Sequence, residues 1–380
     1  MSRVTAFDGI RGWLLIIIAC NHLYGNYVSQ FTREPFGFVS AAEGFVFLSG
    51  FVAYWVYSNI DDAGKQRQKI WRRTRTLYFF HVGALLLTYS CLYLWPVFKA
   101  EWINHYAVSN WYTDPLASLF LVISLLEQPG YFDILLLYLL PMCFLPAALA
   151  LLRQHKVFTL GVLSFTVWSL SHVLNQTLFD AYFVKMFPQL TLHLGYFDPL
   201  AWQWLFYLGV IGAYLSKTKQ LKFSHSLAIK FALIGCFMVL FFIKHTQPVW
   251  FFAFAQQANM PWLLGGNGPV PLLRQINLLL LVYMVVISWR ILQPFYTLKY
   301  PVFIGKHALP VFSFHCVVIY YLGPWLNPWV TSFWLWDVFA CLGFVILLSL
   351  PAYLDLIYQR ANKRAKLKAS ASVYADHLIK

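Results

Sequence analysis

The chain has 380 residues, of which 60% are hydrophobic and 11% are charged, and its formal net charge is +14. Soluble domains carry about 25% charged residues, so this composition excludes a soluble nucleic-acid-binding protein despite the basic excess. The mean hydropathy of +0.61 agrees with that exclusion. The remaining class is an all-α polytopic integral membrane protein.

Apolar stretches of spanning length recur along the chain. About ten transmembrane helices are predicted, at residues 9–27, 38–57, 76–98, 131–152, 157–174, 199–215, 227–243, 275–291, 307–325 and 332–358. With a cytoplasmic N-terminus, the positive-inside bias places all but five of the 28 Lys and Arg residues on the cytoplasmic side. The exceptions are Arg33, Lys99, Lys185, Lys244 and Arg274. We therefore expect a transmembrane domain over residues 1–358, a basic cytoplasmic tail over 359–380, and both termini in the cytoplasm.

Cysteines and aromatic loops give weaker signals. All six cysteines lie in predicted spans without a Cys-x-x-Cys pair, so neither a disulfide framework nor a zinc site is predicted. The connections 99–130 and 245–274 are long, external and rich in aromatic residues, including Trp250 and Trp262. Two interpretations stay open for them: an aromatic belt at the headgroup level, or a surface on which a sugar stacks.

The first predicted helix carries two ionisable residues, which are costly in a membrane and therefore point to function. Arg11 and His22 are eleven positions apart, which puts them on one helix face and about 16 Å apart along the axis. Asp8 lies three residues before Arg11, close enough to orient it.

Glu43 is the matching group on the second predicted helix. It lies about as far from the outer end of its helix as His22 does from the end of the first. A carboxylate beside an imidazole holds its tautomer and stabilises the imidazolium, which is the relation that general-base catalysis needs. Glu43 is therefore expected to orient His22; a structural pair without chemistry is the alternative.

The ninth predicted helix supplies a third polar centre. Lys306 and His307 lie at its cytoplasmic start, and His315 lies about halfway through it. His315 is interpreted either as a second catalytic or substrate-binding group or as a packing histidine. A metal site of His22, Glu43 and His315 has no ligand-spacing motif behind it, and no metal is expected.

Basic residues gather where the cytoplasmic connection 65–75 meets the third predicted helix. Arg72, Arg73 and Arg75 are close enough to the membrane to contact the phosphates of a ligand through charge-assisted hydrogen bonds. His81 lies further along the same helix and is a candidate for lining the same opening.

Polar residues also open two helices on the opposite side. Asp133 opens the fourth predicted helix, whereas Asp198, Trp202 and Gln203 open the sixth. Two acids, an amide and an indole at one level suit a polyhydroxylated acceptor. Helix capping explains Asp198 equally well, because Pro199 follows it at the first helical position.

Through these residues the chain resembles the membrane-bound acyltransferase-3 superfamily. Within it, the chain is similar to the OpgC family of bacterial inner-membrane proteins, which are associated with succinylation of periplasmic glucans. The resemblance rests on ordered matches spread over nearly the whole chain. They are Asp8 to Gly12 with Asn21 and His22, Ser40 to Phe51 with Glu43, Asp133 to Leu135, Trp202 with Gln203, and Gly305 to His315.

The resemblance implies a multi-pass enzyme of the bacterial inner membrane that moves an acyl group from cytoplasmic acyl-CoA to a hydroxyl of an envelope glycan. His22 would be the general base, Glu43 its orienting partner, and Arg11, Arg72, Arg73, Arg75, Lys306 and His307 would hold the donor. The expected partners are membrane lipid, acyl-CoA and the glycan, without nucleic acid.

Several alternatives stay open at this point. The acyl group is succinyl or acetyl, and the acceptor is a periplasmic glucan or a lipopolysaccharide or capsule sugar. Transfer is direct or passes through an acyl-histidine, and the assembly is a monomer or a homodimer. A glycan or proton-coupled transporter is the alternative from another class, because transporters also carry charges inside their helices.

Overall fold

The computed structural model describes residues 5–23, 27–171, 176–218, 226–257, 263 and 270–378. Within these ranges the chain forms helices and no β-strand, and Glu127 and His193 make an isolated bridge. The predicted all-α class is confirmed.

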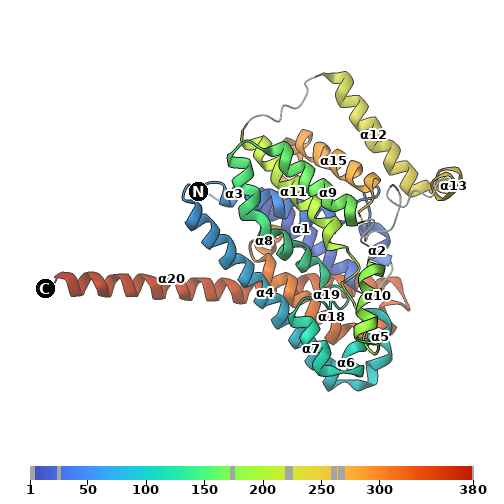
Figure 1. Cartoon of the computed structure of the whole chain (residues 1–380), viewed down its shortest axis with the longest axis horizontal. Helices are drawn as coiled ribbons and strands as arrows, with labels where there is room; N and C mark the ends of the chain where they lie inside the picture. Colours follow the sequence, from blue (N-terminus) through green and yellow to red (C-terminus); the bar gives the residue numbers. More distant parts are fainter. Residues whose placement is uncertain are drawn as a thin grey trace.

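The centre of the molecule is a bundle of helices far apart in sequence (Figure 1). Its members are α1 (Thr5–His22), α3 (Ala41–Tyr57), α4 (Ala63–Leu94), α8 (Asp133–Arg153), α9 (Val157–Ser171), α11 (Pro199–Lys217), α17 (Lys299–Lys306) and α18 (Ala308–Val330). Around it lie α2 (Tyr27–Thr32), η1 (Pro96–Phe98), α5 (Lys99–Tyr106), α6 (Ser109–Thr113), α7 (Pro115–Ile123), α10 (Gln176–Met186), α12 (Leu227–Thr246), α13 (Val249–Gln257), α15 (Leu272–Ile287), α16 (Trp289–Tyr296), α19 (Trp334–Leu347) and α20 (Ser349–Leu378).

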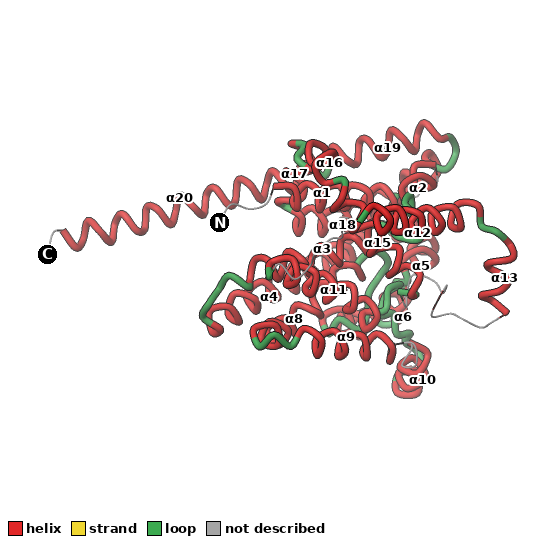
Figure 2. The backbone as a smooth tube through the Cα atoms, turned by 90° about the horizontal axis from the view of Figure 1, so that it is seen from above, coloured by secondary structure: helices red, strands yellow, loops and turns green. Residues whose placement is uncertain are grey.

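The end of the chain is one long helix that extends away from the bundle in both views (Figures 1 and 2). The predicted tail, residues 359–380, is helical to Leu378 and continues α20, while residues 379–380 lie outside the described part. In the predicted loop 245–274, Trp250 lies in α13, whereas Trp262 lies outside the described residues.

The number of helices that can cross a membrane is smaller than predicted. By length and composition, five described helices qualify, or six if α15 and α16, which meet at 91°, form one span. The prediction of about ten spans is therefore not confirmed. One reason is that α3 has 17 residues and α9 has 15, fewer than the roughly 20 that a helix needs to cross the hydrocarbon core.

The connection 65–75, predicted as a loop, is instead the first part of α4. The helix begins early because the Asp62 side chain caps it, accepting a hydrogen bond from the Lys65 amide at 2.5 Å. The three arginines that follow therefore have fixed directions. Arg73 is half-buried, whereas Arg72 and Arg75 are exposed.

Glycines let pairs of central helices touch backbone to backbone. A Cβ atom added to Gly50 of α3 would lie 1.9 Å from the Phe206 carbonyl oxygen of α11, and one added to Gly209 would lie 2.0 Å from the Phe47 oxygen. Close approach through small residues is the usual packing of helices in membranes. The same device brings α1 and α17 together, where a Cβ on Gly12 would lie 1.8 Å from the Pro301 oxygen.

Replacing Gly50 by alanine tests this packing. We expect Gly50→Ala to lower the free energy of unfolding by about 1–3 kcal/mol, because α3 and α11 must move apart. The matched control is Gly83→Ala in α4, where an added Cβ meets nothing within 4 Å; there alanine should stabilise by up to about 1 kcal/mol. Thermal unfolding in detergent measures both, and equal effects of the two substitutions would contradict the close approach.

Candidate active site

Two histidines join the end of α1 to the middle of α18. His22 Nδ1 lies 3.0 Å from His315 Nε2, within hydrogen-bond distance. The Tyr131 ring stacks on the His22 ring with centroids 4.1 Å apart. His315 is 1% exposed, whereas His22 is partly exposed. A substrate can therefore reach His22 more easily than His315, which is buried.

The contact between the two histidines admits an arrangement of protons that suits a base. One ring must donate and the other accept across the 3.0 Å between His22 Nδ1 and His315 Nε2. When His315 carries its proton on Nδ1, its Nε2 accepts the proton of His22 Nδ1, and His22 Nε2 keeps a lone pair. This is the tautomer that a general base requires.

The loop between α7 and α8 supplies Tyr131 with a strained backbone. Tyr131 has φ 72°, in the left-handed region that aromatic residues rarely adopt. Its neighbours hold it there: Cys316 Sγ donates to the Tyr131 carbonyl oxygen at 3.3 Å, and Tyr320 Oη donates to the Gly130 oxygen at 3.1 Å. Strain of this kind concentrates at functional sites, and here it sets the ring against His22.

A buried carboxyl group anchors the same loop. Glu127 accepts hydrogen bonds from Tyr89 Oη at 2.8 Å, Ser118 Oγ at 3.0 Å and Asn110 Nδ2 at 3.2 Å. Burial raises the pKa of Glu127, and the hydrogen bonds from Tyr89, Asn110 and Ser118 act in the opposite direction. The loop that carries Tyr131 is therefore tied to α4, α6 and α7.

The raised pKa of Glu127 gives a pH dependence with a definite sign. Folding favours the protonated acid, so its contribution to stability is complete below the unfolded pKa and is lost as the pH rises through the folded pKa. Glu127→Gln cannot ionise, so its unfolding temperature should vary less with pH than that of the wild type. Thermal unfolding of both proteins from about pH 4 to about pH 8 measures this, and identical pH profiles would contradict it.

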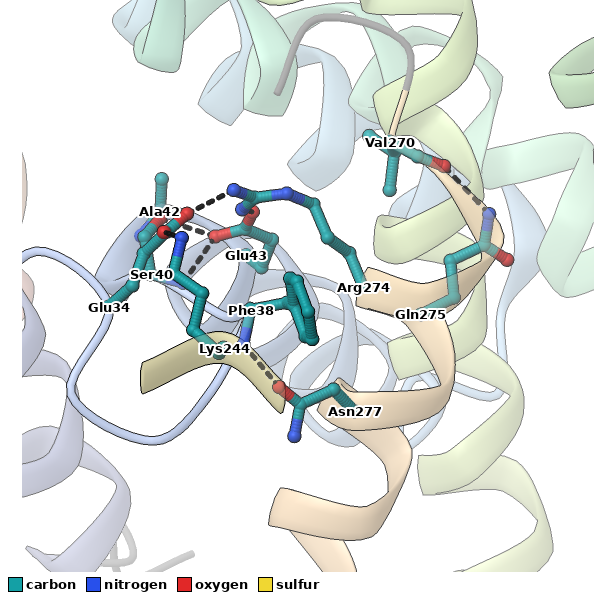
Figure 3. A network of polar contacts seen from close by, with 10 residues as sticks. All are labelled: Glu34, Phe38, Ser40, Ala42, Glu43, Lys244, Val270, Arg274, Gln275 and Asn277. Carbon is teal, nitrogen blue, oxygen red and sulfur yellow. Dashed lines mark hydrogen bonds and ion pairs between the residues drawn. The ribbon is translucent and has the colours of Figure 1, made fainter. Parts of the chain in front are cut away.

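Glu43 does not pair with His22, which corrects the expected carboxylate–histidine dyad. Its partners among the described residues are Arg274 and Ser40 (Figure 3): Glu43 Oε1 lies 2.5 Å from Arg274 Nη1, and Glu43 Oε2 accepts a hydrogen bond from the Ser40 amide at 2.9 Å. The Ser40 hydroxyl also bonds to Glu43. Ser40 and Glu43 form a capping box at the start of α3, so local helix chemistry explains the position of this carboxylate.

Arg274 connects that capping box to a wider network of charges. It also binds Glu34, which in turn pairs with Lys244 of α12 (Figure 3). Asn277 Oδ1, one turn along α15 from Arg274, accepts from the Phe38 amide at 2.6 Å. Two acids and two bases balance their charges, and they fix residues 34–43 against α12 and α15.

This network should dominate the stability of that region. Arg274→Gln leaves the buried Glu43 without a cation, whereas Glu34 keeps Lys244, and should lower the free energy of unfolding by about 3–5 kcal/mol. Adding Glu43→Gln removes the unpaired charge, so the double variant should lose less than the sum of the two single losses. Chemical denaturation of the four proteins measures the cycle, and strictly additive losses would exclude the network.

Three of the predicted donor residues, Arg11, Arg73 and Lys306, lie towards the other end of α1, away from His22. Phe7 contacts Phe51 and Trp55 of α3, with ring centroids 5.2 and 6.5 Å apart. A Cβ on Gly305 would lie 1.8 Å from the Asp8 oxygen, so Arg11 and Lys306 adjoin the contact of α1 with α17. Arg73 faces this end near Tyr57.

His307 has a partner that the sequence did not suggest. Its Nδ1 lies 2.5 Å from Asp355 Oδ2 of α20. His307 therefore joins the start of α18 to α20, and its expected role in holding a donor stays a prediction.

The four residues expected to bind an acceptor are engaged in contacts that position helices. Asp133 Oδ2 accepts from the amides of Tyr196 at 2.8 Å and Phe197 at 3.3 Å. Trp202 is fully buried, with its ring 4.3 Å from that of Phe197. The Asp198 side chain caps α11, accepting from the Leu200 amide at 2.8 Å.

Gln203 completes this pattern of structural contacts. Its Nε2 donates to the Ser164 carbonyl oxygen at 2.8 Å, and Ser164 Oγ donates to Gln203 Oε1 at 2.7 Å, joining α11 to α9. Asp133 and Trp202 therefore meet at one loop, while Gln203 points to a different helix.

The comparison with known families agrees with this architecture. The family described as OpgC protein matches residues 3–359, from α1 into α20. No curated protein and no solved structure matches the chain. Because the family match covers nearly the whole length, and because several helices are long and apolar enough to cross a membrane, the chain belongs to the OpgC family of membrane glucan-modifying acyltransferases.

Proposed function

We propose that the protein transfers an acyl group from acyl-CoA to a hydroxyl group of a periplasmic glucan at the His22–His315 pair. The observation that carries the proposal is the hydrogen bond between a partly exposed and a buried histidine, 3.0 Å apart, within a bundle of apolar helices. A neutral pair of this kind tolerates burial better than an ion pair, and it still accepts a proton.

His22 Nε2 takes the proton of the attacking hydroxyl group. His315 fulfils the orienting function expected of Glu43, because it accepts the Nδ1 proton of His22 and stabilises the imidazolium that forms. Tyr131, stacked on the ring, limits its rotation. Transfer is completed when the proton passes from His22 to the leaving thiolate, which departs as free CoA.

The basic end of α1 suits the donor. Arg11, Arg73 and Lys306 lie at that end, about 16 Å from His22 along the helix axis. A cofactor with phosphates at one end and a thioester on a long arm at the other matches this separation, with the phosphates on the arginines. In this proposal the basic end faces the cytoplasm of a bacterium, and the His22 end faces the periplasm.

The reaction is tested with purified protein, labelled succinyl-CoA or acetyl-CoA, and an extract of envelope glucan. We expect label in the glucan with the wild type, and a loss of at least about 10²-fold in His22→Ala and His315→Ala, because general-base catalysis contributes about 10²–10⁴-fold. His105→Ala, at an exposed position of α5, is the control and should retain full activity.

The donor that labels the glucan identifies the acyl group. Label that enters lipopolysaccharide or capsule sugar in place of glucan would change the acceptor. Wild-type protein that transfers no label to any of these glycans would overturn the proposal and favour transport.

A further inference from the structure

His81 of α4 is a buried histidine whose polar atoms have no hydrogen-bond partner. It is 0% exposed, and neither Nδ1 nor Nε2 meets a donor or acceptor among the described residues with hydrogen-bond geometry. An unmade hydrogen bond in an apolar interior is expensive, and native structures keep very few of them. His81 therefore has hydrogen-bonding capacity that a bound substrate can use.

The loop that carries Tyr131 places His81 beside the histidine pair. The His81 ring contacts the Phe132 ring edge-on, with centroids 6.1 Å apart, and the preceding residue, Tyr131, stacks on His22. Gln128 of the same loop approaches the His81 ring, and its Oε1 is also buried without a partner among the described residues. His81 and His22 therefore contact consecutive residues of one short segment.

The alignment of α4 with α18 gives the depth of His81. Ser90 Oγ of α4 lies 2.7 Å from Tyr321 Oη of α18. Phe98, just after the end of α4, meets Trp325, which lies further along α18, with ring centroids 4.8 Å apart. The two helices therefore run in the same direction. Contacts between the two helices join residues 227 to 234 positions apart, which puts His81 level with residues 308–315 of α18. This stretch ends at His315 and contains Ser313, whose buried Oγ has no partner among the described residues.

This position lies between the basic end and the histidine pair. Arg73 is eight residues before His81 on α4, or about 12 Å nearer the basic end. A donor whose phosphates lie at Arg73 would therefore pass His81 and Ser313 just before its thioester reaches His22.

We propose that His81 is a further catalytic residue, whose ring N–H donates a hydrogen bond to the thioester carbonyl oxygen, with the Ser313 hydroxyl group as a second donor. The proposal rests on the acyl transfer proposed above. Donors that are already dehydrated and fixed in place stabilise a developing oxyanion most strongly, because no water has to be reorganised during the reaction.

The step balances without a further reactant. The acceptor oxygen forms a bond to the thioester carbon while His22 takes the hydroxyl proton, and the carbonyl oxygen gains the negative charge that His81 and Ser313 stabilise. The carbon–sulfur bond then breaks, the carbonyl re-forms, and the thiolate receives the proton from His22. His81 neither gains nor loses a proton.

The test compares His81→Phe, His81→Gln and the wild type in the labelled transfer assay. We expect His81→Phe to lower kcat by about 10²–10³-fold, with the KM for acyl-CoA within about threefold of the wild-type value. His81→Gln retains an N–H donor and should recover at least about tenfold of that loss. Thr74→Val is the control, because Thr74 is buried on the same face of α4 but already donates to the Ile70 oxygen at 3.1 Å.

Thermal unfolding separates catalysis from structure. Removing an unpartnered buried group should leave the unfolding temperature of His81→Phe equal to or above that of the wild type, although its activity falls. A His81→Phe protein with wild-type kcat would overturn the inference while leaving the acyl transfer intact. Parallel losses of activity and unfolding temperature, with His81→Gln no better than His81→Phe, would also overturn it. A wild type that transfers no acyl group would overturn both proposals.

Discussion

The rest of the structure depends on one constraint, that a polar side chain buried among apolar helices must find a partner. Glu43 meets Arg274, His307 meets Asp355, and Asp133 accepts from two backbone amides. Each of these contacts joins elements that are distant in sequence. Buried polar pairs therefore specify which helices become neighbours, while apolar packing supplies most of the stabilisation.

The same constraint separates structural from catalytic groups. Glu43 and Asp133 have their hydrogen-bonding capacity taken up by the protein itself, which leaves little for a substrate. His22 differs because it is partly exposed, and one of its ring nitrogens contacts His315 while the other has no hydrogen-bond partner among the described residues. His81 differs further, since both of its nitrogens lack partners among the described residues. The groups with unused capacity surround one loop, and the proposed chemistry is placed there.

The sequence predicted the helical class and put Arg11 and His22 on one helix, because composition and helical spacing are local properties. It did not predict which charges would pair, since partners more than 200 residues apart have no local signature. A signal for the Glu43 network was nevertheless present. Arg274 and Lys244 were two of the five basic residues that broke the positive-inside pattern, and the structure pairs both with acids. The strained backbone of Tyr131 had no counterpart in the sequence.

The most direct test of the central claim uses sealed vesicles that contain the wild-type protein, with glucan enclosed and labelled acyl-CoA outside. The account predicts that vesicles with the basic end outward transfer label to the enclosed glucan, and that His22→Ala vesicles do not. Two results would contradict transfer from the basic end of α1 to the histidine pair. One is label that enters glucan only when donor and acceptor are on the same side of the membrane. The other is hydrolysis of the thioester without labelling of the glucan.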